Sequence, residues 1–209
     1  MTRMRVVNLG LPKTGTTTLT DALRHAGLTV ADWRIRPGQS NRDDIPRMHL
    51  GKIIYDDYFN TGDPLARLDE FDVINEMSAV REDRSLWPQT DWGVLSAIEK
   101  HHPSVKFILT MRDPAKTADS MMRWNNLGKH RLPKADIPGL PRGFGGKTEQ
   151  IERWMSGHYA FCHHVFAGRN NFMSYNIEDP QAQNKIATYL GIDLPWWGQS
   201  NVGKAEAES

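Results

Sequence analysis

The feature that most constrains the fold is a loop rich in glycine and threonine near the N-terminus. The short β-rich run from Met4 to Leu9 is typical of a β-strand, and it leads directly into the loop Gly10-Leu11-Pro12-Lys13-Thr14-Gly15-Thr16-Thr17-Thr18. Beyond it, the segment from Thr17 to Ala26 carries its apolar residues on one helical stripe, and Gly27 stands where a left-handed residue commonly ends a helix. A strand, a loop and a helix in this order predict the first unit of an α/β domain.

Strand and helix patterns continue to alternate along the chain. Strands are predicted at Phe71 to Met77, Val105 to Met111 and Asn171 to Ile177, and helices at Ile45 to Phe59, Trp87 to His101, Lys147 to Ala167 and Pro180 to Leu190, with another helix opened by Asp113-Pro114. This alternation predicts a three-layer α/β sandwich, in which helices flank a central parallel sheet. A length of 209 residues favours a single domain over residues 1–203, with 204–209 as a flexible tail. Residues 126–146 hold three prolines and five glycines, which predicts a long loop and a possible lid over a binding site.

Charge and composition exclude several classes of protein. Lysine and arginine number 26 against 25 aspartates and glutamates, a balance that argues against a nucleic-acid or membrane-surface binder. The apolar run before Lys13 is too short for a signal peptide or a membrane span, so we expect a cytoplasmic protein. The single cysteine, Cys162, lies in a helix-like stretch and is expected to be a buried, inert thiol.

The loop itself predicts a phosphate site. Backbone N–H groups and a helix dipole converge on an anion at such a turn, so the sandwich is expected to be of the P-loop nucleotide-binding type. Gly10 and Gly15 have the spacing of GxxxxGK[ST], but Thr16 stands where nucleotide triphosphatases have lysine, and Lys13 lies inside the loop instead. The strand ending at Met111 runs into Arg112, so its tip offers a cation before any magnesium-binding aspartate. These departures favour a nucleotide whose transferable group carries less charge than a γ-phosphate and can be transferred without a metal. A sulfuryl group fits this description.

Two segments resemble the signatures of the sulfotransferases that use 3′-phosphoadenosine 5′-phosphosulfate (PAPS). The first is Pro12-Lys13-Thr14-Gly15-Thr16-Thr17, and the second is Phe107-Ile108-Leu109-Thr110-Met111-Arg112-Asp113-Pro114 followed by Ser120. The stretch from Met173 to Ile192 is similar to the last strand and helix of the family, so the resemblance spans about residues 4 to 201.

The resemblance implies a PAPS-dependent sulfotransferase that acts on a hydroxyl or amine of a small-molecule or carbohydrate acceptor, releases adenosine 3′,5′-bisphosphate and requires no metal. It assigns Lys13 to the bridging oxygen of the breaking bond. The 5′-phosphate would be held by Thr14, Gly15, Thr16, Thr17 and Thr18. Arg112 at a strand end and Ser120 on the following helix suit the 3′-phosphate, although a salt bridge for Arg112 and a solvent-facing Ser120 are the alternatives.

The general base is the least certain assignment. Cytosolic members of the family have a histidine after a strand between the two signatures, and the corresponding residue here is Glu76. Burial would raise the pKa of a carboxyl at this place, but Glu76 is equally well explained as a partner of Arg81 or Lys13. His49 and Asp32 are the reserve candidates.

The acceptor and the remaining contacts stay open. An anionic acceptor would suit four basic residues in or beside the long loop, although a solvated charged loop is the preferred interpretation: Lys129, Arg131, Lys134 and Arg142. An aromatic pocket or the core would contain the tryptophans Trp124, Trp154 and Trp196-Trp197. Lys204 is a weak candidate for a third cofactor contact. The pairs His101-His102 and His163-His164 lack other ligands at metal spacing, so no zinc site is expected. A small-molecule kinase and a non-catalytic nucleotide-binding relative are the rival functions, and the sequence leaves the oligomeric state open.

Overall fold

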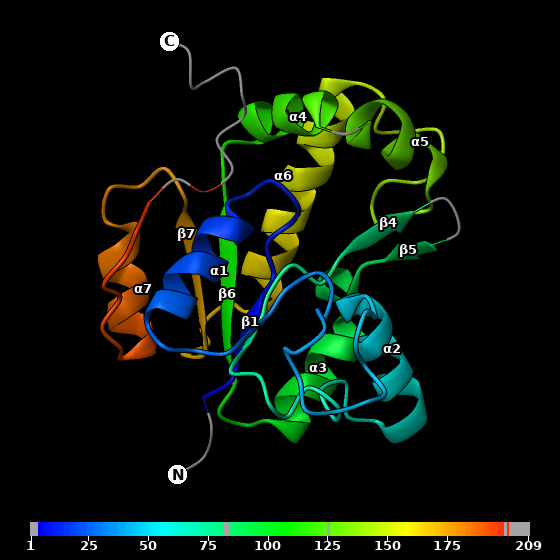
Figure 1. Ribbon diagram of the computed structural model, residues 1–209. Helices are drawn as coiled ribbons and strands as arrows, with labels where there is room; N and C mark the ends of the chain where they lie inside the picture. The colour runs from blue at the N-terminus through cyan, green and yellow to red at the C-terminus, as the bar shows by residue number, and fades with distance from the viewer. Residues whose placement is uncertain (1–3, 82–83, 125, 199, 201–209) are drawn as a thin grey trace.

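The computed structural model describes residues 4–81, 84–124, 126–198 and 200. Its centre is a five-stranded sheet in the order β2-β3-β1-β6-β7, and every neighbouring pair of strands is parallel (Figure 1). The strands are β1 (Val6–Asn8), β2 (Val30–Ala31), β3 (Val73–Ile74), β6 (Lys106–Met111) and β7 (Phe172–Asn176). The parallel α/β sheet expected from the sequence is therefore confirmed.

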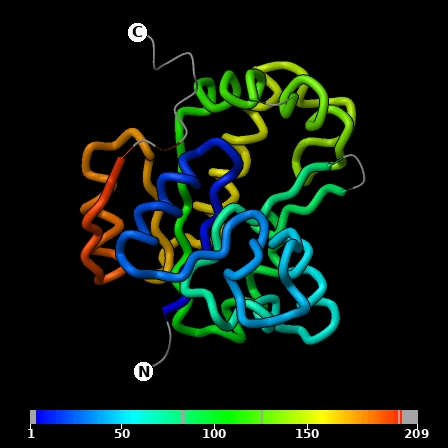
Figure 2. Tube along the Cα trace, in the orientation of Figure 1, coloured from blue at the N-terminus to red at the C-terminus, as the bar shows by residue number. Residues whose placement is uncertain are grey.

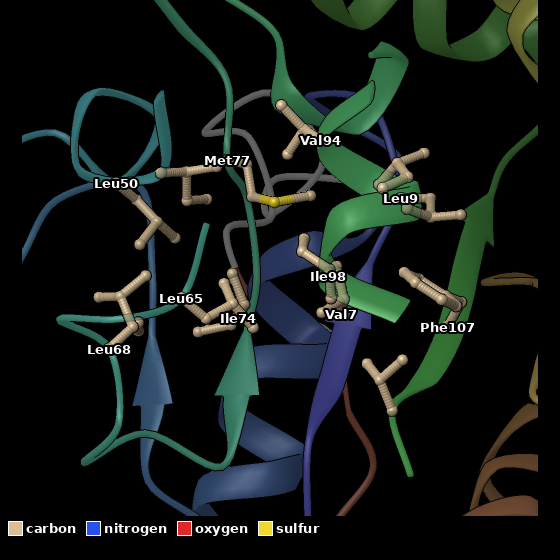
Figure 3. Packing of buried hydrophobic residues seen from close by; sticks show 14 of the residues in the cluster. Val7, Leu9, Leu50, Leu65, Leu68, Ile74, Met77, Val94, Ile98 and Phe107 are labelled. Carbon is tan, nitrogen blue, oxygen red and sulfur yellow. The ribbon is translucent and has the colours of Figure 1, made fainter. Parts of the chain in front are cut away.

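Helices cover both faces of the sheet. One face packs against α1 (Thr16–His25) and α7 (Ala182–Leu190), and the other against α2 (Leu50–Thr61), α3 (Trp92–His101) and α6 (Thr148–Val165). Side chains alternate along each strand, so that Val6 joins the cluster around α1 while Val7 joins the cluster around α3. Figure 3 shows Val7, Ile74 and Phe107 of three strands packed with Val94 and Ile98 of α3. Among the described residues, no helix is both long enough and apolar enough to cross a membrane.

The order of the strands marks one place at the carboxyl edge of the sheet, the candidate ligand crevice of this fold type. The chain leaves β1 through α1 toward β2 on one side, and it leaves β6 through α4 (Pro114–Arg123) toward β7 on the other (Figure 2). Since β1 and β6 are neighbours, their carboxyl ends form the topological switch point, where open α/β sheets bind ligands. The loop after β1, Glu76 shortly after β3 and Arg112 after β6 all lie at this edge.

Some elements begin later or are shorter than the sequence pattern predicts. The helix expected at Ile45 to Phe59 begins only at Leu50, because residues before it form an irregular segment. The helix expected from Trp87 starts with a 3-10 turn, η1 (Pro88–Thr90), and α3 then begins after Asp91, whose side chain accepts hydrogen bonds from the N–H groups of Gly93 and Val94 at 2.9 and 3.3 Å. The strand expected at Phe71 to Met77 is reduced to β3, since the backbone turns at Glu76 with φ 33°.

Other elements give no sequence signal. Strand β2 is too short for a periodic pattern, and so is the antiparallel hairpin of β4 (Ala79–Arg81) and β5 (Arg84–Leu86). The expected long loop at 126–146 also contains a π-helical turn, η2 (Leu127–Arg131), and a short helix, α5 (Leu132–Lys134). Its buried side chains form a second core with α4 and α6: Leu127, Leu132, Ala135, Ile137 and Leu140. This segment is thus a packed cover at the top of the molecule in Figure 1.

Candidate functional site

The loop after β1 requires glycine at two positions. A Cβ atom on Gly10 would lie 1.7 Å from Oγ1 of Thr110, which is shorter than any real contact. Gly15 has φ 103°, and its Cβ would lie 2.6 Å from Cγ1 of Ile177. Glycine therefore lets the loop press against β6 at one end and turn into α1 at the other.

A buried polar network holds the loop from beneath. Asn8 donates from Nδ2 to Oδ1 of Asn75 at 2.6 Å, and its own Oδ1 accepts from the N–H of Gly10 at 3.0 Å and from Oγ1 of Thr110 at 3.2 Å. Nδ2 of Asn75 donates to the carbonyl oxygen of Thr16 at 2.7 Å, and thereby ties the end of β3 to the start of α1. The sequence analysis missed this network, and its only signal is two asparagines at the ends of otherwise apolar strands. Because all these groups are bonded, the network makes the loop rigid.

The start of α1 is suited to an anion. The first-turn N–H groups of a helix have no acceptor within the helix, and among the described residues no side chain caps this one. The hydroxyl of Thr14 points inward, since it donates to the carbonyl of Leu11 at 2.7 Å and lies 3.0 Å from Oγ1 of Thr110. Oγ1 of Thr18 accepts from the N–H of Ser200 at 3.4 Å. The loop therefore offers an anion mainly its backbone N–H groups.

Lys13 lies beside this anion site in an unusual backbone conformation. It is one of four described non-glycine residues with positive φ, at 70°, and its Nζ lies 4.8 Å from the ring centroid of Trp124. Burial lowers the pKa of Lys13, and the charges of Arg112 and Arg123 lower it further, while Glu76 opposes them. The ammonium group is thus held among other cations at the switch point.

The carboxyl of Glu76 has a pKa near neutral pH. Its Oε2 accepts a hydrogen bond from the hydroxyl of Thr16 at 3.0 Å, and its Oε1 accepts one from Ser78 at 2.5 Å. Burial raises the pKa of Glu76 to about 7, and the charge of Asp32 raises it as well, against the two hydroxyl donors and Lys13. Of the partners expected from the sequence, Lys13 therefore acts on Glu76 through its charge, whereas the hydrogen bonds come from Thr16 and Ser78.

The reserve candidates lie close to the end of β2, since His49 forms a β-bridge with Arg34. Asp32 directly follows β2, and burial raises the pKa of its carboxyl. His49 is the residue that precedes α2, and its ring centroid lies 5.7 Å from that of Trp33. Burial lowers the pKa of His49, and the charges of Arg81, Arg84 and Arg34 lower it further.

Arg112 directly follows β6, and Ser120 lies on α4, the helix that comes next in the chain. Nε of Arg112 lies 3.2 Å from Oε1 of Glu178, and Nζ of Lys116 lies 2.8 Å from Oε2 of the same carboxylate. The salt bridge that the sequence left as the alternative for Arg112 is thus present. The side chain of Ser120, on α4, is partly buried.

Several other residues from the sequence analysis lie outside the crevice or outside the description. Trp154 is buried and donates from Nε1 to the carbonyl of Pro138 at 2.9 Å, and Trp196 stacks on His25. Cys162 is buried, and burial raises the pKa of its thiol to about 12. The described residues include no group of three or more histidine, cysteine, aspartate or glutamate side chains that could hold a metal ion. Lys204 lies outside the described residues.

Comparison with known proteins gives one family match. A model of the family described as "Sulfotransferase domain" matches residues 5–133, more than half of the chain, and this range includes Lys13, Glu76, Arg112 and Ser120. Among solved structures, a sulfotransferase from Alicyclobacillus acidocaldarius aligns with 97% of this chain and 87% of its own at 16% sequence identity and a TM-score of 0.47. No curated protein matches the chain.

Proposed function

Because the chain belongs to the sulfotransferase domain family, we propose that it transfers a sulfuryl group from PAPS to a hydroxyl or amine of a small-molecule or carbohydrate acceptor. One observation carries the proposal: at the carboxyl edge of the sheet Glu76 accepts a hydrogen bond at 3.0 Å from Thr16 of the loop that holds Lys13, and Lys13 and Glu76 each shift the pKa of the other. A cation for the leaving group and a carboxyl for the acceptor proton are thus neighbours at the place where this fold binds ligands.

The donor has two phosphate groups, and the crevice has two places suited to them. The close approach of Gly10 to Thr110 and the uncapped start of α1 favour the 5′-phosphate, which Gly15, Thr16, Thr17 and Thr18 would hold. Thr14 shapes the loop from within, because its hydroxyl is bonded to Leu11. Arg112 and Ser120 would hold the 3′-phosphate, for which Arg112 has to exchange Glu178 for the ligand.

In this proposal, Lys13 stabilises the leaving group. As the bond between sulfur and the bridging oxygen breaks, negative charge grows on that oxygen, and an ammonium group fixed beside it stabilises the transition state. Trp124 under Nζ and the positive φ of Lys13 both restrict where the ammonium group can lie. This charge stabilisation comes from the lysine, so the proposal requires no metal ion.

Glu76 is the general base in this proposal. A carboxyl with a pKa of about 7 is substantially ionised at neutral pH and still basic enough to take a proton from the attacking hydroxyl or amine. The hydroxyls of Thr16 and Ser78 hold both carboxylate oxygens in place. Asp32 supports the role through its charge, which raises the pKa of Glu76.

Thermal unfolding with and without ligands tests the nucleotide assignment. We expect adenosine 3′,5′-bisphosphate in the presence of a chelator to stabilise the protein by about 2.7 kcal/mol at one hundred times its Kd, and Arg112→Gln to weaken this effect. Stabilisation by ATP with magnesium, and none by the bisphosphate, would instead identify the small-molecule kinase.

Transfer from labelled PAPS to a broad set of acceptors tests the reaction. We expect Glu76→Gln to lose turnover by about 100-fold or more while it still binds the bisphosphate. Wild-type protein that binds the bisphosphate but labels no acceptor would be a non-catalytic relative. A Glu76→Gln variant with full turnover would remove Glu76 from the role of base.

A further inference from the structure

A row of contacts leads from the catalytic lysine to an arginine on the cover segment. Nζ of Lys13 lies 4.8 Å from the ring centroid of Trp124, and Cζ of Arg131 lies 5.5 Å from the same centroid. A single indole therefore separates the position proposed for the leaving group from the guanidinium of Arg131.

Further interactions connect Arg131 with the surroundings of Glu76. The charge of Arg81, at the end of β4, acts on both Arg131 and His49. The ring of His49 lies against Trp33, and the neighbouring Asp32 acts on Glu76. Arg34, His49, Arg81 and Arg131 are here called the basic cluster: Arg34 forms a β-bridge with His49, and Arg131 donates to the carbonyl of Val80, the residue before Arg81.

The basic cluster lacks the carboxylates that neutralise other arginines of this protein. Among the residues that the structure describes, Arg34, Arg81 and Arg131 form no ion pair within 4 Å, whereas Arg112 and Arg142 each do. Arg34 and Arg131 donate to backbone carbonyls of Arg47 and Val80 instead, at 2.7 and 3.3 Å. Glu82 and Asp83, which stand between β4 and β5 in the sequence, lie outside the described residues.

Two polar atoms of the basic cluster are buried without a partner. Nε of Arg131 and Nδ1 of His49 have no hydrogen bond with any group that the structure describes. Nε of Arg131 can only donate, and a buried donor without an acceptor costs free energy; with the charge of Arg81 beside it, such an arrangement points to a bound anion. Burial lowers the pKa of Arg131, and the charge of Arg81 lowers it further.

Two tryptophans contact members of the basic cluster, Trp33 against His49 and Trp124 against Arg131. Trp33 and Trp124 have 36% and 43% of their surface exposed, although large apolar side chains are usually covered. Exposed indoles bind flat ring faces of sugars and arenes, and arginine forks bind carboxylate or sulfate oxygens in pairs. We propose that the acceptor is a ring-bearing anion, a sugar acid or an arene carboxylate or sulfate, whose charged group binds Arg81 and Arg131.

The proposal rests on the proposed sulfuryl transfer and explains how the acceptor is oriented. Glu76 and Asp32 repel the anionic group of such an acceptor, and the basic cluster attracts it. The charged end therefore turns toward Arg81 and Arg131, and an uncharged hydroxyl or amine of the same molecule turns toward Glu76. The charges of the crevice thus select both the class of the acceptor and the group that reacts.

Binding of matched acceptor pairs tests this inference. Isothermal titration of the bisphosphate-saturated protein would compare 4-nitrophenyl β-D-glucuronide with 4-nitrophenyl β-D-glucoside, and 4-hydroxybenzoate with 4-hydroxybenzamide. We expect the acidic member of at least one pair to bind about tenfold or more tightly than its neutral counterpart, because a charge-assisted pair contributes at least that factor. Transfer from PAPS should show the same preference in kcat/KM.

Variants show whether the basic cluster causes the preference. Arg81→Gln, at an exposed position, should reduce it severalfold, and Arg81→Gln combined with Arg131→Gln should abolish it, while affinity for the bisphosphate stays within about twofold. Arg142→Gln is the matched control, because Arg142 belongs to the same cover segment but pairs with Asp136 at 2.9 Å. Circular dichroism checks that each variant is folded.

Three results would overturn the inference: neutral members that bind as tightly as the acidic ones in both pairs, no binding by any of the four compounds, or a preference that survives in the double variant. Titration of the bisphosphate alone, before any acceptor is added, tests the donor site separately. A protein that binds the bisphosphate but not the acidic acceptors would keep the proposed donor site and lose only the anionic acceptor.

Discussion

The buried carboxyl of Glu76 should make the stability of the fold depend on pH. Its pKa rises from the ordinary 4.5 to about 7, mainly because burial disfavours the charged form. The folded protein then keeps a proton that the unfolded chain releases. The stabilisation is fully present below about pH 4.5 and is lost as the pH rises through about 7. At about 1.4 kcal/mol per pKa unit, ionisation of Glu76 costs about 3 kcal/mol of the free energy of unfolding.

Urea unfolding at about pH 5 and about pH 8 measures this cost. We expect wild-type protein to lose about 2.5 kcal/mol more between the two pH values than Glu76→Gln does, because the amide cannot ionise and because part of the linkage lies below pH 5. The exposed Glu149 on α6 provides the control, and Glu149→Gln should follow the wild type within a few tenths of a kcal/mol. The same ionisation should appear in kcat/KM, which should rise with pH to a plateau above about pH 7.

Equal losses for wild type and Glu76→Gln would refute the reasoning. They would mean that Glu76 ionises in the folded protein as it does in water. A carboxyl of that kind would be too weak a base for the role proposed here, and the assignment would pass to Asp32 or His49.

Three further predictions follow from the contacts of the crevice. Gly10→Ala should destabilise the fold by about 1–3 kcal/mol in urea unfolding, because its Cβ would overlap Oγ1 of Thr110; adding Thr110→Ala should recover part of the loss, and strict additivity would contradict the proposed clash. Glu178→Gln should tighten binding of the bisphosphate by about twofold to fivefold in a titration, since the half-exposed carboxylate no longer competes for Arg112; weaker binding would argue that Glu178 supports the site. Cys162 should react with a thiol reagent at least about 100-fold faster in urea than in the folded protein, because it is buried and its thiol pKa is raised to about 12; equal rates would contradict its burial.

The site divides into parts that the sequence reveals and parts that it does not. Lys13 and the glycines around it stand out because one short segment holds a strand, a phosphate loop and a helix. Arg112 stands out because it directly follows β6, a strand of mostly apolar residues. The place of Glu76 after its strand was foreseen, whereas its hydrogen bonds to Thr16 and Ser78 were not, because they depend on a backbone turn with φ 33°.

Contacts across long sequence separations were beyond the reach of pattern analysis. Asn8 and Asn75 are 67 residues apart and form the buried network that fixes the loop. Sequence analysis preferred a solvated role for the charges of the cover segment, yet the structure places Arg131 against Trp124 and next to Arg81. No local pattern links these residues, because the short hairpin that carries Arg81 has no periodic signal of its own.

The sequence by itself determined the alternation of the longer strands and helices and the glycine positions of the loop after β1, because hydrophobic periodicity and glycine requirements act over a few neighbouring residues. Only the tertiary structure decided the burial of Glu76, the pairing of Arg112 with Glu178 and the assembly of the basic cluster. Burial and Coulomb interactions depend on distances through space, and these distances exist only once the parallel sheet brings its carboxyl ends to one edge.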